Sequence, residues 1–106
     1  MAQTRDEIVE QLQKLFLELK RKHDIRAAYL FGSFARGSQR DYSDVDIAVV
    51  LGSFRNGSPF DERFEIFHEV QQQNALFEVV CVGEKEFEAD EGMLIRLIKR
   101  EGLRIL

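Results

Sequence analysis

The spacing of apolar residues near the start of the chain predicts a helix. Thr4 is a suitable N-cap because Glu7 follows three residues later, which is the pattern of a capping box. Apolar residues then recur at helical spacing and form one stripe: Ile8, Leu12, Leu15, Phe16 and Leu19. We expect this helix to end at about Lys22.

Two apolar runs of strand length follow. Residues 27–31 form the first run, and Gly32 ends it because glycine allows a tight turn without steric cost. The second run, residues 46–51, is rich in branched side chains, begins near Asp44 and ends at Gly52. These runs predict two consecutive strands.

The second half of the chain alternates between helical and strand patterns. Ser58 and Pro59 form a helix start, and the helical spacing continues to Gln72 or Gln73. Residues 76–82 predict a third strand, 84–100 a helix, and the tail 103–106 can pack as a last strand. The fold class is therefore α/β (α+β), with helices flanking a small mixed sheet.

Composition narrows the class of protein. The 106 residues contain 44% hydrophobic residues, which suits a single domain over residues 1–106. The net charge of −4 without a basic stripe argues against nucleic acid as the main partner. No run of eighteen apolar residues and no signal peptide is found, so we expect a cytoplasmic protein.

Three potentially reactive side chains have ordinary structural explanations. Cys81 has no second cysteine to pair with, and it lies in an apolar run where we expect a small buried thiol. His23 and His68 stand alone on predicted helices, and we interpret both as surface or capping residues.

The segment between the first two predicted strands carries the most informative chemistry. Asp44 and Asp46 are two residues apart at the start of a strand, so their carboxylates would point to the same face. Two carboxylates this close repel each other unless a cation neutralises them, and hard oxygen ligands suit magnesium bound together with phosphates. A pair of capping carboxylates in a turn is the competing interpretation.

Gly32 and Ser33 could bind the phosphates of the same ligand. A glycine at a sharp turn lets the backbone approach an anion, and the serine hydroxyl and free N–H groups would point at a phosphate. Arg36 and Arg40 lie on the same connection and would add positive charge. A Gly-Ser turn alone is common, but together with the two aspartates it predicts a triphosphate site for reaction at phosphorus.

The string GSFARGSQRDYSDVDIAVV resembles the signature of the DNA polymerase beta nucleotidyltransferase superfamily, in the short form of the minimal nucleotidyltransferases. The resemblance implies a polymerase beta palm-like core, ATP or another nucleoside triphosphate as donor, two Mg²⁺ ions and release of pyrophosphate. It also implies that Gly32 and Ser33 hold the phosphates, and that Asp44 and Asp46 hold the metals.

Members of this superfamily usually carry a third carboxylate on a later strand, which completes the metal site and assists deprotonation of the acceptor. Glu78 is the best placed residue for this role, although the motif would normally have aspartate there. Glutamate is one methylene longer, and magnesium is demanding in its geometry. A glutamate that faces solvent at the edge of the sheet is the competing interpretation.

The resemblance further implies a partner. Minimal nucleotidyltransferases act as antitoxins that transfer AMP to a tyrosine of a HEPN-type helical toxin, so we expect such a partner, with a homo-oligomer left open. Two alternatives remain: a catalytically weak module that neutralises its partner by occlusion, and the catalytic subunit of an aminoglycoside-type nucleotidyltransferase. A neighbouring gene for a small helical protein with an Arg-x4-6-His motif would identify the partner.

Overall fold

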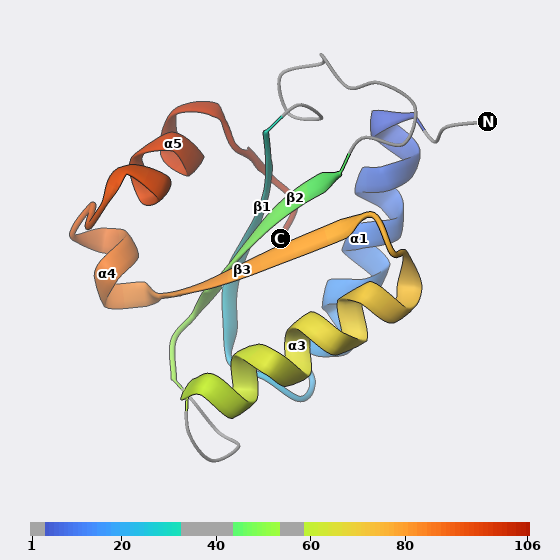
Figure 1. Cartoon of the computed structure of the whole chain (residues 1–106), viewed down its shortest axis with the longest axis horizontal. Helices are drawn as coiled ribbons and strands as arrows, with labels where there is room; N and C mark the ends of the chain where they lie inside the picture. The colour runs from blue at the N-terminus through green and yellow to red at the C-terminus, as the bar shows by residue number, and fades with distance from the viewer. Residues whose placement is uncertain (1–3, 33–43, 54–58) are drawn as a thin grey trace.

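A mixed sheet with the strand order β3-β2-β1-β4 forms the centre of the computed structural model, which describes residues 4–32, 44–53 and 59–106 (Figure 1). The strands are β1 (Ile25–Phe31), β2 (Val45–Leu51), β3 (Phe77–Gly83) and β4 (Leu103–Arg104). The helices are α1 (Arg5–Leu19), α3 (Pro59–Gln73), α4 (Glu84–Glu88) and α5 (Met93–Glu101). The predicted α/β class is confirmed.

The pairing of the strands follows from their connections. β1 and β2 are consecutive and antiparallel, whereas β2 and β3 are parallel because α3 crosses between them. The short β4 pairs with β1 in antiparallel orientation, Leu103 opposite Leu30, so the predicted last strand exists but covers only two residues.

The first helix begins as its sequence predicts. The Thr4 hydroxyl accepts from the Glu7 backbone N–H, and the Glu7 carboxylate accepts from the Thr4 backbone N–H, each at 3.2 Å. This capping box satisfies two N–H groups that the first turn leaves unpaired. The helical stripe then buries Ile8, Leu12, Phe16 and Leu19.

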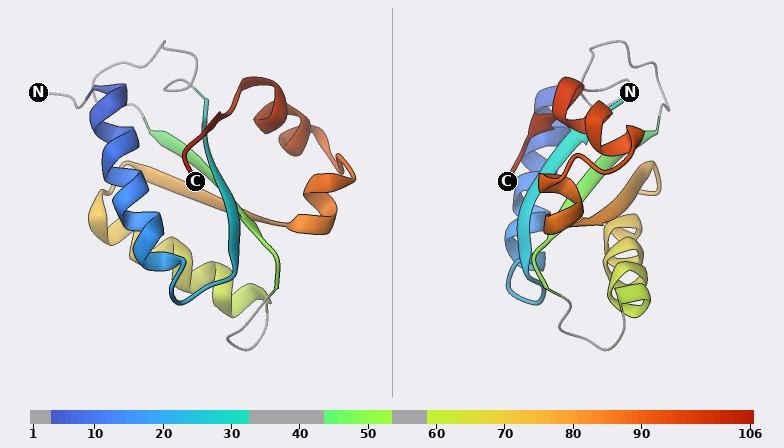
Figure 2. Two further views of the ribbon diagram at one scale, coloured as in Figure 1. Left: turned by 180° about the vertical axis from the view of Figure 1, so that it is seen from behind. Right: turned by 90° about the vertical axis from the view of Figure 1, so that its left-hand side faces the viewer.

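Helices cover the two faces of the sheet (Figure 2). Each face has its own set of apolar side chains. On one face, residues of α1 and α3 form the main core together with alternate residues of the strands, among them Ile47, Val49 and Phe77. On the other face, α4 and α5 pack against the intervening strand residues, among them Ala48 and Val50. The alternation explains why β2 is apolar on both sides.

The prediction of one helix over 84–100 is wrong. The structure has two helices there, because the chain turns between them with Asp90 at φ 54° and Gly92 at φ 94°. The left-handed conformation is cheap for glycine and accessible to aspartate, so these two residues end one helix and start the next.

The prediction of a surface or capping role for His23 is also wrong. His23 follows α1 and is fully buried, with Nδ1 2.8 Å from the equally buried Oε1 of Glu62 on α3. Its Nε2 has no hydrogen-bond partner among the described residues. The pair links the α1–β1 connection to the first turn of α3.

Candidate active site

The C-terminal end of β1 and the N-terminal ends of β2 and β3 lie side by side at the same end of the sheet. Phe31, the last residue of β1, pairs with Asp46 on β2, and Asp46 is in parallel register with Glu78 on β3. Side chains in register on adjacent strands point to the same face and lie about 5 Å apart at Cβ. The fold thus brings together two acidic residues that are 32 positions apart in the sequence.

The face on which these residues lie follows from their neighbours. Ala48 and Val80, two positions after Asp46 and Glu78, belong to or pack against the cluster beneath α4 and α5. Residues two apart in a strand share a face. Asp46 and Glu78 therefore lie on the α4–α5 face, opposite the main core.

Gly32 forms the turn that follows β1. Its φ is 75°, in the region that favours glycine, and a Cβ atom at this position would lie 2.2 Å from Oδ2 of Asp46. A side chain at position 32 would therefore force the Asp46 carboxylate to move. The predicted approach of this backbone to a phosphate stays a prediction, and the described neighbour of Gly32 is the Asp46 carboxylate.

The three candidate carboxylates differ in exposure. Asp44 lies just before β2 and is exposed, Asp46 is partly buried, and Glu78 is exposed on the edge strand β3. Within residues 4–32, 44–53 and 59–106, no group of three His, Cys, Asp or Glu side chains is arranged to hold a metal ion. Carboxylate oxygens are nevertheless the donors that magnesium prefers.

The remaining predicted nucleotide ligands, Ser33, Arg36 and Arg40, lie outside the described residues. Their contacts with phosphate stay a prediction. No helix in the described part of the chain is long and apolar enough to cross a membrane.

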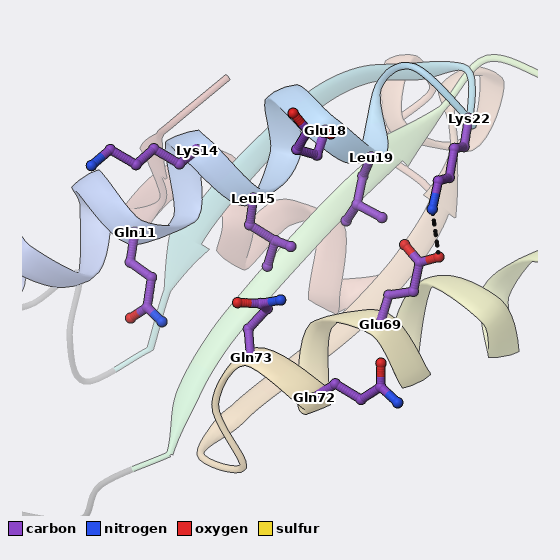
Figure 3. Close-up of a pocket in the computed structure, with 9 residues that line it drawn as sticks. All are labelled: Gln11, Lys14, Leu15, Glu18, Leu19, Lys22, Glu69, Gln72 and Gln73. Atoms are coloured by element: carbon purple, nitrogen blue, oxygen red, sulfur yellow. Dashed lines mark hydrogen bonds and ion pairs between the residues drawn. The ribbon is translucent and has the colours of Figure 1, made fainter.

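A groove among the described residues lies away from this end of the sheet. It has a volume of about 510 Å³ and runs between α1 and α3, on the opposite side of the sheet from Asp46 (Figure 3). The side chain of Lys22 reaches across it to the Glu69 carboxylate, 3.3 Å from Nζ to Oε1. Long polar side chains and two leucines line the groove, and no predicted site residue does.

Cys81 on β3 is not an activated nucleophile. Burial raises the pKa of its thiol to about 11, and the positive charge of Arg63 offsets only part of this effect. The thiol therefore stays protonated at neutral pH, as expected for a structural cysteine.

The fold, the glycine turn and the in-register acidic residues define a small α/β protein of the nucleotidyltransferase class. The chain belongs to the family described as Polymerase beta, Nucleotidyltransferase, whose sequence profile matches residues 10–105.

Relatives from Methanocaldococcus jannaschii support this assignment. One, named as a candidate protein adenylyltransferase, is 38% identical over 69 residues, which covers 65% of this chain and 68% of the relative. Another with the same description is 46% identical over 46 residues, covering 43% of this chain and 54% of its own length. The match thus spans about half of the second relative.

Solved structures share the fold at lower identity. A candidate nucleotidyltransferase from Sulfolobus solfataricus superposes with a TM-score of 0.68 at 19% identity, covering 94% of this chain and 80% of that one. An MNT antitoxin complex with a tri-AMPylated HEPN toxin from Shewanella oneidensis gives 0.56 at 17% identity, covering 92% and 71%. A toxin–antitoxin complex with AMP-PNP gives 0.59 at 20%, covering 89% and 72%. These likenesses show the fold.

Proposed function

We propose that the chain is a magnesium-dependent adenylyltransferase that transfers AMP from ATP to a hydroxyl group of a protein, in an antitoxin role. The observation that carries this proposal is the register of Asp46 with Glu78 beside the Gly32 turn. The family assignment and the relatives named as candidate protein adenylyltransferases support the reaction type. The fold shared with antitoxins in HEPN complexes supports the partner.

The chemistry is a displacement at the α-phosphorus of ATP. The acceptor oxygen forms a new bond to this phosphorus while the bond to the bridging oxygen breaks, and pyrophosphate leaves. Bound magnesium would neutralise charge on the phosphates. Asp44 and Asp46 would hold the ions, and Glu78 would complete the site and take the proton of the acceptor hydroxyl.

Substrate positioning in this proposal comes from the turn and the loop after β1. Gly32 lets the backbone of the turn lie close to the Asp46 carboxylate, and a triphosphate bound at this turn would lie next to the carboxylates. Ser33 and the guanidinium groups of Arg36 and Arg40 would bind the phosphates. The acceptor would be a tyrosine of a HEPN-type helical protein.

The test is transfer of labelled AMP from ATP, with magnesium, to the HEPN-type protein of the neighbouring gene. Asp46→Asn should lower the rate about a hundredfold, which is typical for loss of one electrostatic stabiliser. Glu10→Gln removes an exposed carboxylate on α1 and is the matched control, with a rate within twofold of wild type. An Asp46→Asn rate within a few-fold of wild type would exclude this site.

A second function is favoured by one observation. Glu78 is exposed and stands where the superfamily usually has aspartate, and no three-carboxylate metal group is found among the described residues. The chain would then neutralise its partner by occlusion with little transfer. In that case the Asp46→Asn variant would still protect cells from the toxin, and Glu78→Asp would raise the transfer rate.

A further inference from the structure

The outer surface of α5 forms a shallow apolar groove of about 320 Å³, which we call the α5 groove. Its lining consists of Met93, Leu94, Arg96, Leu97 and Arg100. Met93 is 84% exposed and Leu94 40% exposed, whereas Ile95 and Ile98 of the same helix are buried against the sheet. The helix therefore has apolar residues on the side that its own fold does not cover, which is typical of an interaction surface.

The charge around the groove is opposite to that of the whole chain. Residues 93–106 contain four of the 15 basic residues but one of the 19 acidic ones. The ammonium group of Lys99 forms an ion pair with Asp90 and lies 4.6 Å from the ring centre of Phe87 on α4, so it already has partners within the chain.

The two arginines of the groove are the cations available to a partner. The guanidinium of Arg96 makes no hydrogen bond or ion pair with the described residues. The guanidinium of Arg100 forms an exposed ion pair with the adjacent Glu101, at 3.7 Å. They stand one helical turn apart, so two guanidinium groups flank the exposed apolar side chains.

The groove borders the candidate active site. Leu97 is half-buried, and its inner side packs with the cluster that contains Phe31, the residue before the Gly32 turn. Val80, which shares a strand face with Glu78, packs against the same cluster. After Gly102 the chain pairs Leu103 with Leu30, so the last turn of α5 lies next to the end of β1 (Figure 2).

We propose that the α5 groove is the docking site for the protein that carries the acceptor hydroxyl, and that this protein presents a helix with apolar residues flanked by Asp or Glu. The proposal rests on the proposed function. Apolar burial would supply affinity, and the arginines would select an acidic partner and fix its register. Docking beside Phe31 would bring the acceptor hydroxyl of the partner to the end of the sheet where Asp46 and Glu78 lie.

A protein fits this surface better than a membrane. Two of the five apolar side chains of α5, Ile95 and Ile98, are buried in the core. This leaves three exposed or half-exposed apolar side chains on a nine-residue helix. Membrane-surface helices require a larger apolar face. The net charge of −4 would also oppose an anionic lipid surface.

The experiment compares three proteins: wild type, the Arg96→Glu/Arg100→Glu double variant, and a Lys14→Glu/Arg21→Glu control. The control reverses two exposed charges on or just after α1, where the Lys14 and Arg21 side chains are 77% and 78% exposed. Calorimetry measures binding to the HEPN-type protein of the neighbouring gene and, separately, binding of ATP with magnesium.

We expect the arginine variant to bind the HEPN-type protein at least tenfold more weakly, with ATP affinity within twofold of wild type. The control should bind both ligands like wild type. Leu94→Asp should weaken protein binding in the same way, because it places a charge among the apolar contacts. Rising salt should weaken binding by the wild type more than by the arginine variant.

Two results would overturn the docking site: unchanged binding of the HEPN-type protein by the arginine variant, or no binding of that protein by the wild type. The proposed function fails separately. Wild-type protein that binds through the groove but transfers no label to its partner would retain the docking site and exclude the transferase role. Transfer of label to the partner that is unchanged in the arginine variant would retain the transferase role and exclude the docking site.

Discussion

The contact between Gly32 and Asp46 is the residue-scale feature with the clearest consequence. The Cβ of an alanine at position 32 would lie 2.2 Å from the Asp46 carboxylate oxygen. The alanine would also have to adopt a positive φ, which L residues avoid. Gly92 shares the positive φ, but apart from its chain neighbours no atom of the described residues lies within 4 Å of the position that its Cβ would take. Substitutions at the two glycines therefore distinguish the effect of backbone strain, which both share, from the effect of the contact with Asp46, which only Gly32 makes.

We predict that Gly32→Ala and Gly92→Ala each lower the free energy of unfolding by about 1 kcal/mol or more through strain. Only Gly32→Ala should also weaken ATP binding, and by more than Ser33→Ala, which removes one hydroxyl. Urea denaturation and calorimetry measure the two effects. Equal losses of ATP affinity in both glycine variants would show that the contact with Asp46 is irrelevant to the nucleotide.

The buried pair of His23 and Glu62 predicts strong coupling in stability. His23→Leu or Glu62→Met alone should cost about 3 kcal/mol, because each leaves the other polar group buried without this partner. The double variant should cost clearly less than the sum, since an apolar pair leaves no polar group of the pair buried without its partner. Additive losses in a urea-denaturation double-mutant cycle would argue against the pair.

The raised pKa of Cys81 predicts slow alkylation of the folded protein. With a pKa of about 11 rather than 9.0, the thiolate is scarce at pH 8, so iodoacetamide should react at least tenfold faster after unfolding in urea. The protonated thiol favours the folded state below pH 9, and this contribution should be lost as pH rises towards 11. Equal alkylation rates in the folded and unfolded states would contradict the burial of the thiol.

At the scale of the element, α1 depends on its capping box. Thr4→Ala removes the hydroxyl that accepts from Glu7 and should lower the free energy of unfolding by about 1 kcal/mol. Thr4→Ser keeps the hydroxyl and is the control, with a loss of a few tenths. Thermal denaturation followed by circular dichroism compares them, and identical midpoints for the alanine and serine variants would mean that the cap is unimportant.

At the scale of the whole molecule, nucleotide binding should stabilise the fold. ATP with magnesium at about 100 times the Kd would add about 2.7 kcal/mol to the free energy of unfolding, and the Tm should rise by roughly 10 °C. Asp46→Asn should lose most of this shift while its own Tm without ligand stays close to that of the wild type. An equal shift in both proteins would place the nucleotide elsewhere.

The helices and strands themselves were largely readable from periodicity. Strands were predicted within two residues of their observed bounds, and α1 and α3 from their caps and apolar stripes. The break at Asp90 and Gly92 was missed because a short apolar pattern continued across it on both sides. The burial of His23 was missed because its partner, Glu62, is 39 residues away and only packing brings the two together.

For the candidate site, the sequence by itself determined which residues lie at the strand ends. Gly32 at a strand end and Asp46 within the next strand follow from short-range pattern, since turns and strand faces are decided by neighbours in sequence. Tertiary structure decided the register that sets Asp46 beside Glu78 and the Gly32 turn against a carboxylate, because β3 lies beside β2 only when α3 packs on one face of the sheet. The same packing turned Ile95 and Ile98 inward and left Met93 and Leu94 exposed.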